Sequence, residues 1–144
     1  MEQQREWRIG TSELRFEPPD LLWADFRGEF SLEETKRLVE VYRELSARPF
    51  YMVADLREVT AISEETRRYL SEHADPRWIL GVIYVGARLV HKAAVKSLLV
   101  GAWLLGRAEK SELAKIHFAS TPAQAYELLA RLRTQHGTSG ATFS

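Results

Sequence analysis

Two apolar segments of strand length, separated by a helical pattern, constrain the fold of this chain more than any other feature. Residues 50–56 (FYMVADL) and 78–86 (WILGVIYVG) are nearly continuous in apolar residues and contain many β-branched and aromatic side chains. Such runs are typical of parallel strands that are buried on both faces. Residues 63–74 between them have a weaker helical pattern, with Tyr69 and Leu70 as the main apolar contacts. This order predicts parallel crossover connections in one α/β sheet.

The first third of the chain has a different pattern, in which apolar and polar residues alternate. Alternation with a period of two is typical of strands that bury one face. Three short strands are expected around Trp7 and Ile9, around Leu14 and Phe16, and over residues 22–26, with turns at residues 10–12 and 18–20. These segments predict an antiparallel β-meander that precedes the parallel part of the sheet.

After Gly28 the apolar period changes from two to 3.6, which indicates a helix of about four turns. Its apolar face comprises Leu32, Leu38, Val39, Tyr42 and Leu45. Ser31 and Glu34 have the spacing of a capping box, in which each side chain bonds the backbone N–H of the other residue. Pro49 is expected to end this helix before the first buried strand.

The remaining segments continue the alternation of helices and strands. A third helix is expected over residues 89–105, a strand over 115–119, and a final helix that starts at Thr121, with Pro122 at its first position and Gln124 as its capping partner. The predicted order is β-β-β-α-β-α-β-α-β-α, which is a mixed, mostly parallel sheet covered by helices. Residues 1–133 are expected to form one domain, and residues 134–144, which lack apolar periodicity, a flexible tail.

Composition excludes several classes of function. The 144 residues contain 20 basic and 20 acidic side chains, so no net field attracts nucleic acid. There is no cysteine, which excludes disulfides and thiol chemistry and fits a reducing compartment. The longest apolar run, residues 98–105, is far shorter than the roughly 20 residues of a membrane span, so a cytoplasmic location is expected.

The sequence contains no recognisable catalytic, metal or cofactor motif. The four histidines, at positions 73, 91, 117 and 136, lack metal-ligand spacing and lie in no nucleophile motif. The glycines at 81, 86, 101 and 106 form neither GxGxxG nor a P-loop. Nothing in the sequence brings Asp25 and Asp55 together as an acid–base pair. A protein without catalytic activity and without a cofactor is therefore expected.

The order and spacing of four segments resemble the STAS superfamily and, within it, the SpoIIAA-like branch, whose bacterial members include anti-sigma-factor antagonists. The segments are FRGEFSLEETKRL, MVADLREVTAISEET, WILGVIYVG and HFASTPAQAYELL, within about residues 21–133. The resemblance implies the same mixed α/β fold. It also implies a signalling role in which the domain regulates another protein by binding it.

The resemblance also locates the switch of the antagonist family, which is a serine phosphorylated at a helix start. In this chain Asp55 and Leu56 match the strand end, and residues 59–62 match the apolar bridge. Ser63 falls on the family's aspartate, Glu64 on the first serine, Glu65 on the phosphorylated serine and Thr66 on the glycine. The phosphoacceptor is therefore absent, and Glu65 supplies one negative charge in place of nearly two.

A partner-binding surface is predicted on this loop and helix. Its residues are Asp55, Thr60, Ser63, Glu64, Glu65, Arg67 and Arg68. The partner is an unidentified protein, for which a regulatory kinase and an anti-sigma-like protein are the candidates. Each residue also has a purely structural interpretation: Ser63 is an N-cap or a displaced phosphoacceptor, Glu64 and Glu65 complement the helix dipole, and Asp55 caps the following loop.

The third predicted helix is apolar on nearly every face, although one sheet can cover only one side of a helix. A homodimer is therefore predicted through Leu98, Leu99, Ala102 and Trp103. The alternative is that neighbouring helices cover this face completely.

A function of a different class also fits the sequence. SpoIIAA-like folds resemble lipid-binding α/β domains, and the third helix and the central strand at 78–86 would flank a pocket for a small apolar ligand.

Overall fold

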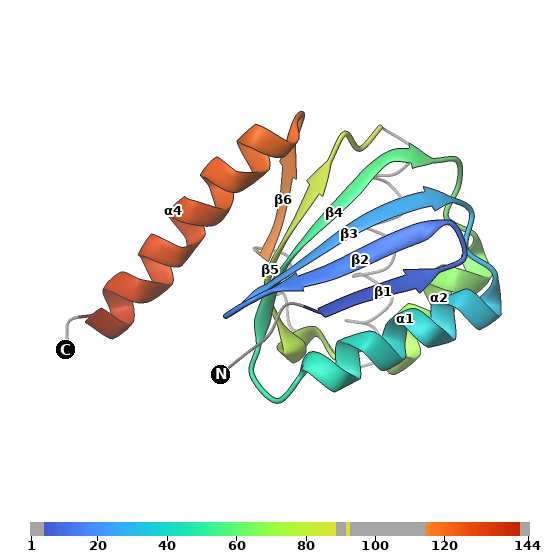
Figure 1. Ribbon diagram of the computed structural model, residues 1–144, viewed down its shortest axis with the longest axis horizontal. Coiled ribbons are helices and arrows are strands. Elements are labelled where there is room, and N and C mark those ends of the chain that lie inside the picture. Colours follow the sequence, from blue (N-terminus) through green and yellow to red (C-terminus); the bar gives the residue numbers. More distant parts are fainter. Residues whose placement is uncertain (1–4, 89–91, 93–114, 142–144) are drawn as a thin grey trace.

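A computed structural model describes residues 5–88, 92 and 115–141, and within them the chain forms one six-stranded mixed sheet. The strands lie side by side in chain order (Figure 1). They are β1 (Arg5–Ile9), β2 (Ser12–Glu17), β3 (Leu21–Gly28), β4 (Phe50–Val59), β5 (Ile79–Val85) and β6 (Ile116–Ala119). β1, β2 and β3 pair antiparallel, and β3 to β6 pair parallel. The predicted meander and the predicted mixed sheet are both confirmed.

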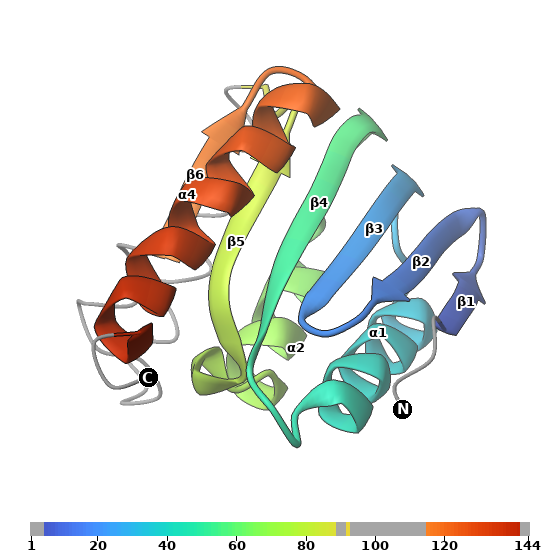
Figure 2. The ribbon, with the colours of Figure 1, turned by 60° about the vertical axis from the view of Figure 1, so that its left-hand side comes forward.

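Helices cover both faces of this sheet (Figure 2). α1 (Leu32–Leu45) and α2 (Glu64–His73) lie on one face, and α4 (Pro122–Ala141) lies on the other. α1 and α2 share a face, as is expected when β3, β4 and β5 follow one another in the same direction across the sheet, because parallel crossovers are nearly always right-handed.

The start of α1 is specified by local interactions, as the sequence predicts. The Ser31 hydroxyl accepts from the Glu34 N–H at 3.1 Å, and a Glu34 carboxylate oxygen accepts from the Ser31 N–H at 2.8 Å. The turn between β1 and β2 packs closely against this capping box: a Cβ added to Gly10 would overlap the Glu34 carboxylate. Gly10 also has a φ of 60°, a conformation that glycine adopts without strain.

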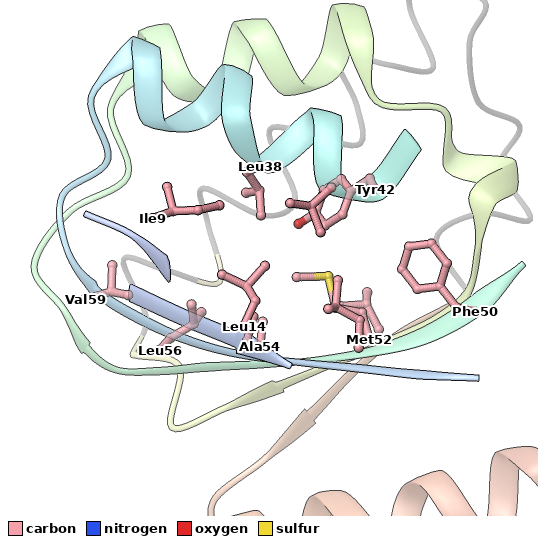
Figure 3. Packing of buried hydrophobic residues seen from close by; sticks show 13 residues of the cluster. Ile9, Leu14, Leu38, Tyr42, Phe50, Met52, Ala54, Leu56 and Val59 are labelled. Carbon is pink, nitrogen blue, oxygen red and sulfur yellow. The ribbon is translucent and has the colours of Figure 1, made fainter. Parts of the chain in front are cut away.

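The larger core lies between the sheet and the helices α1 and α2 (Figure 3). Leu38 and Tyr42 reach from α1 toward Leu14 and Met52 of the sheet. The smaller core lies on the opposite face, where α4 packs Ala125 and Leu129 against alternate residues of the same strands. The strands β3, β4 and β5 are therefore buried on both faces, which explains their apolar runs.

Several boundaries differ from the prediction. β4 continues past the apolar run to Val59, because β3 bulges after Asp25 and then pairs Arg27 with Glu58 and Gly28 with Val59. The short 3-10 helix η1 (Pro76–Trp78) precedes β5, so the strand begins at Ile79.

The C-terminal end also differs from the prediction. α4 is helical to Ala141, beyond the expected end of the periodic pattern at Arg133. The reason is that a helix needs only backbone hydrogen bonds to continue, and apolar periodicity reports packing rather than helicity. The division into a domain over 1–133 and a flexible tail stays a prediction.

The predicted third helix over residues 89–105 lies outside the described residues, apart from Lys92. The predicted dimer contacts Leu98, Leu99, Ala102 and Trp103 lie outside them as well.

Candidate functional site

Ser63 lies at the start of α2. From the sequence it could be either an N-cap or a displaced phosphoacceptor. Its hydroxyl accepts from the Thr66 N–H at 3.1 Å and donates to the Thr66 hydroxyl at 3.1 Å. Its backbone is extended, with φ −66° and ψ 156°, as an N-cap residue requires. The N-cap interpretation is therefore confirmed.

Thr66, which the sequence resemblance aligns with the family's glycine, ties α2 to α1. It is buried, and its one hydroxyl proton is shared between the Thr35 hydroxyl at 3.1 Å and the Phe30 carbonyl at 3.4 Å. The Thr35 hydroxyl in turn donates to the Ser31 carbonyl at 2.9 Å. This chain of hydroxyl groups joins the N-termini of both helices, so the first turn of α2 has a defined position on the domain.

Outside this hydroxyl chain, the first turns of α2 present charged side chains to solvent. Glu64, Glu65 and Arg68 are exposed, and Arg68 pairs with Glu64 at 3.0 Å. Arg67 is half-buried and donates to the Ile62 carbonyl at 3.1 Å. Glu65 forms no ion pair with any residue that the structure describes. We define the α2 surface as the side chains that these two turns and the preceding loop bring together: Thr60, Ser63, Glu64, Glu65, Arg67 and Arg68.

Asp55, which the sequence groups with these residues, lies on the other face of the sheet. Ala54 and Leu56 of β4 pack with α1 and α2, whereas Val53 packs with α4. Because side chains alternate along a strand, Asp55 points to the α4 face. The sheet therefore separates Asp55 from the α2 surface.

On that face Asp55 is bound by Arg57. Its carboxylate accepts from the Arg57 backbone N–H at 3.0 Å and from the Arg57 guanidinium at 2.6 Å. Burial by itself disfavours the charged form, but the hydrogen bonds from Arg57 outweigh it and hold the pKa of Asp55 below its ordinary value. The loop-capping interpretation fits this geometry, and a proton-donating role does not.

Asp25 and Asp55, for which the sequence offered no reason to expect proximity, are neighbours in the sheet. Asp25 of β3 and Asp55 of β4 occupy paired positions in the parallel ladder. Each has its own partners: Asp25 accepts from the Trp23 indole at 3.1 Å and lies 3.8 Å from the Arg15 guanidinium. Asp25 is the fifth residue of β3 and Asp55 the sixth of β4, so counting along the two strands would not have predicted this pairing.

The structure gives the surroundings of two of the four histidines, His73 and His117. His73 stacks on Tyr69, with ring centroids 4.0 Å apart, and its Nδ1 lies 3.1 Å from the Tyr69 carbonyl. His117 is half-buried, and burial lowers its pKa. Among the described residues no group of three or more His, Asp or Glu side chains is placed to hold a metal ion. None of the helices in the described part of the chain has the length and apolar character needed to cross a membrane.

An apolar pocket of about 200 Å³ lies between α2 and the sheet. Its described lining comes from α1, α2, η1, β3, β4, β5 and β6, and includes Tyr42, Met52, Leu70, Val82 and Tyr84. The alternative function predicts a pocket beside the central strand, and this strand, β5, does line it. Sequence reasoning did not connect α1 or α2 with a pocket, because their apolar residues have the same helical spacing whether they fill a core or line a cavity.

Comparison with known proteins identifies the fold. No protein family profile and no curated protein matches the chain. A crystal structure of an uncharacterized protein of the DUF3478 family with a SpoIIAA-like fold, from Shewanella loihica PV-4, superposes with a TM-score of 0.53 at 13% identity, covering 88% of this chain and 92% of that one. A crystal structure of Mglu matches with a TM-score of 0.36 at 11% identity, over 74% of this chain and 19% of that one. By its fold, the protein is therefore a SpoIIAA-like α/β domain, as the sequence resemblance implies.

Proposed function

We propose that the protein is a non-catalytic regulatory module that binds another protein through the α2 surface. The observation that carries this proposal is the position of Glu65. It is an exposed carboxylate in the first turn of a well-anchored helix, and the sequence resemblance aligns it with the phosphorylated serine of the antagonist family. The SpoIIAA-like fold supports a role of this kind.

The geometry of the α2 surface favours recognition of a positively charged patch. Glu64 is already paired with Arg68, whereas Glu65 has no ion pair among the described residues. A cationic partner side chain would therefore pair with Glu65 at the helix start. Charges at the rim of an interface mainly control the rate of association and its salt dependence.

A glutamate at position 65 implies a module whose binding surface is not switched by phosphorylation at that position. A phosphoserine changes its charge when a kinase or phosphatase acts, but a glutamate keeps one negative charge. The nearby hydroxyl groups do not replace the missing serine, because Ser63 caps α2 and Thr66 is buried. Binding would therefore depend on the amounts of the two proteins, and not on phosphorylation at position 65. An anti-sigma-like protein and a regulatory kinase remain the candidate partners.

A charge reversal at position 65 tests this proposal, with position 72 as its control. Glu65 and Glu72 are both exposed on α2 and neither has an ion pair with a described residue, but only Glu65 lies in the first turn. A photo-reactive residue at Thr60 would be introduced into the wild type, Glu65→Lys and Glu72→Lys, and crosslinked proteins would be identified in the native host.

The proposal expects one partner that is crosslinked by the wild type and by Glu72→Lys but lost in Glu65→Lys. Titration with the purified partner should then show binding weakened by about tenfold or more in Glu65→Lys. Equal capture by all three proteins, or loss only in Glu72→Lys, would contradict a role for the α2 surface. Circular dichroism of each variant checks that α2 is intact.

A further inference from the structure

The pocket between α2 and the sheet has the size and lining of a ligand site. Its volume of about 200 Å³ exceeds the ~150 Å³ of an engineered apolar cavity that stays dry and binds benzene. Phe26, Met52, Leu70 and Val82 contribute apolar side chains to it. Protein interiors are close-packed, so a space of this size is unusual unless something occupies it.

A polar group faces this apolar space without a partner. Tyr42 of α1 lines the pocket and is only 6% exposed. Within the part of the chain that the structure describes, its hydroxyl forms no hydrogen bond. Figure 3 shows its ring between α1 and the sheet. Buried hydroxyl groups in native proteins are nearly always hydrogen-bonded, because an unpaired one loses its interaction with water and receives nothing in return.

Tyr84 of β5 adds a second hydroxyl to the same pocket. It too forms no hydrogen bond with the described residues, and burial raises its pKa to about 12. The pKa of Tyr42 is raised by its own burial and also by Tyr84. Both groups therefore stay neutral at ordinary pH, and each can donate or accept one hydrogen bond.

The charged side chains at the pocket are engaged with protein groups. Arg67 donates to the Ile62 carbonyl at 3.1 Å, and Lys115 to the Pro76 carbonyl at 3.4 Å. Asp75 accepts from the Arg77 guanidinium at 2.8 Å. The lining therefore favours a neutral ligand over an ionised one, because an ion would leave water without a matching charge.

We propose that this pocket binds a small, neutral, mainly apolar molecule whose one hydrogen-bonding group pairs with the hydroxyl of Tyr42. The site shares Arg67 with the α2 surface but none of the acidic residues of that surface. Thr66, Arg67, Leu70 and Ser71 line the pocket from α2, whereas Glu64, Glu65 and Arg68 of the same helix do not. Loss of the ligand site would leave the proposed protein-binding role intact, and loss of protein binding would leave the ligand site intact.

Two probes of the same shape test the proposal on the full chain. In p-cresol a hydroxyl replaces one methyl group of p-xylene, so the pair isolates the hydrogen bond from apolar contact. Dissociation constants would be measured by NMR titration. The wild type should bind both probes saturably and p-cresol more tightly, whereas 4-methylbenzoate, which is charged, should not bind.

Variants then assign the hydrogen bond. Tyr42→Phe should weaken p-cresol binding about fivefold, the usual net effect of one neutral hydrogen bond, and leave p-xylene binding unchanged. Tyr51→Phe is the matched control, because Tyr51 packs on the α4 face and does not line the pocket. Leu70→Phe, which adds volume to the lining, should weaken binding of both probes.

Three results would overturn the proposal. The first is the absence of saturable binding by either neutral probe. The second is an equal loss of p-cresol binding in Tyr42→Phe and Tyr51→Phe. The third is a set of nuclear Overhauser contacts, in protein without probe, between the Tyr42 ring and residues 89–114, because the chain itself would then fill the pocket.

Discussion

Asp55 shows how strongly a single side chain depends on its immediate neighbours. Its carboxylate is nearly buried, with 8% of the side chain exposed, while the Arg57 side chain that binds it is 53% exposed. Burial alone would raise the pKa of Asp55, and the backbone and guanidinium of Arg57 reverse that effect. Asp55 is therefore an ionised anchor for Arg57 on the α4 face.

The lowered pKa predicts a contribution to stability that depends on pH. In the unfolded chain Asp55 has its ordinary pKa of 3.8, and in the folded protein the pKa is lower. The stabilisation is therefore complete above about pH 3.8 and is lost as the pH falls through the folded pKa. Urea denaturation over this range should show a free energy of unfolding that falls less steeply in Asp55→Asn than in the wild type. Parallel curves for these two proteins, or an equal change in the control Glu72→Gln, would contradict the prediction.

At the scale of elements, α1 and α2 are coupled through the hydroxyl groups at their N-termini. Ser31 and Ser63 cap the two helices, and Thr35 and Thr66 join the caps across the helix pair. The proposed binding surface and the proposed ligand pocket both include residues of α2, so the position of this helix matters for both functions.

The cap of α2 leads to a prediction that separates two interpretations of Ser63. Ser63→Ala should lower the free energy of unfolding by about 1 kcal/mol, because the Thr66 N–H loses its acceptor. Ser63→Asp should remain close to the wild type, since aspartate caps well and its charge favours a helix N-terminus. Urea denaturation measures both. If Ser63→Asp is as unstable as Ser63→Ala, the hydroxyl acts in some way other than as a cap.

At the scale of the whole molecule, the prediction concerns how many copies of the chain associate. The sequence predicts a dimer through Leu98, Leu99, Ala102 and Trp103, which lie outside the described residues. Covering about 300 Å² of apolar surface there would favour association by several kcal/mol before the entropy of association is subtracted.

Size-exclusion chromatography with light scattering tests this prediction. The wild type should elute as a dimer, and Trp103→Glu should shift it to a monomer because the substitution buries a charge in the interface. Tyr126→Glu is the control, because Tyr126 is 43% exposed and stacks on Trp23 on the α4 face. A monomeric wild type, or dissociation caused by Tyr126→Glu, would contradict the predicted interface.

The sequence by itself determined the order of strands and helices and the starts of α1, α2 and α4. These features depend on interactions between residues close in the chain, such as the capping pairs and the alternation of apolar residues. The resemblance to SpoIIAA-like domains could also be detected from the sequence, because it rests on the order and spacing of such local segments.

Only the tertiary structure decided which of these residues share a site. It separated Asp55 from the α2 surface, because one residue of register decides which face of a sheet a side chain occupies. It made Asp25 and Asp55 neighbours through the pairing of β3 with β4. It also showed the pocket, where Tyr42 of α1 and Tyr84 of β5 meet across 42 positions of sequence (84 − 42). Contacts of this range follow from how the layers pack, and no local pattern in the sequence records them.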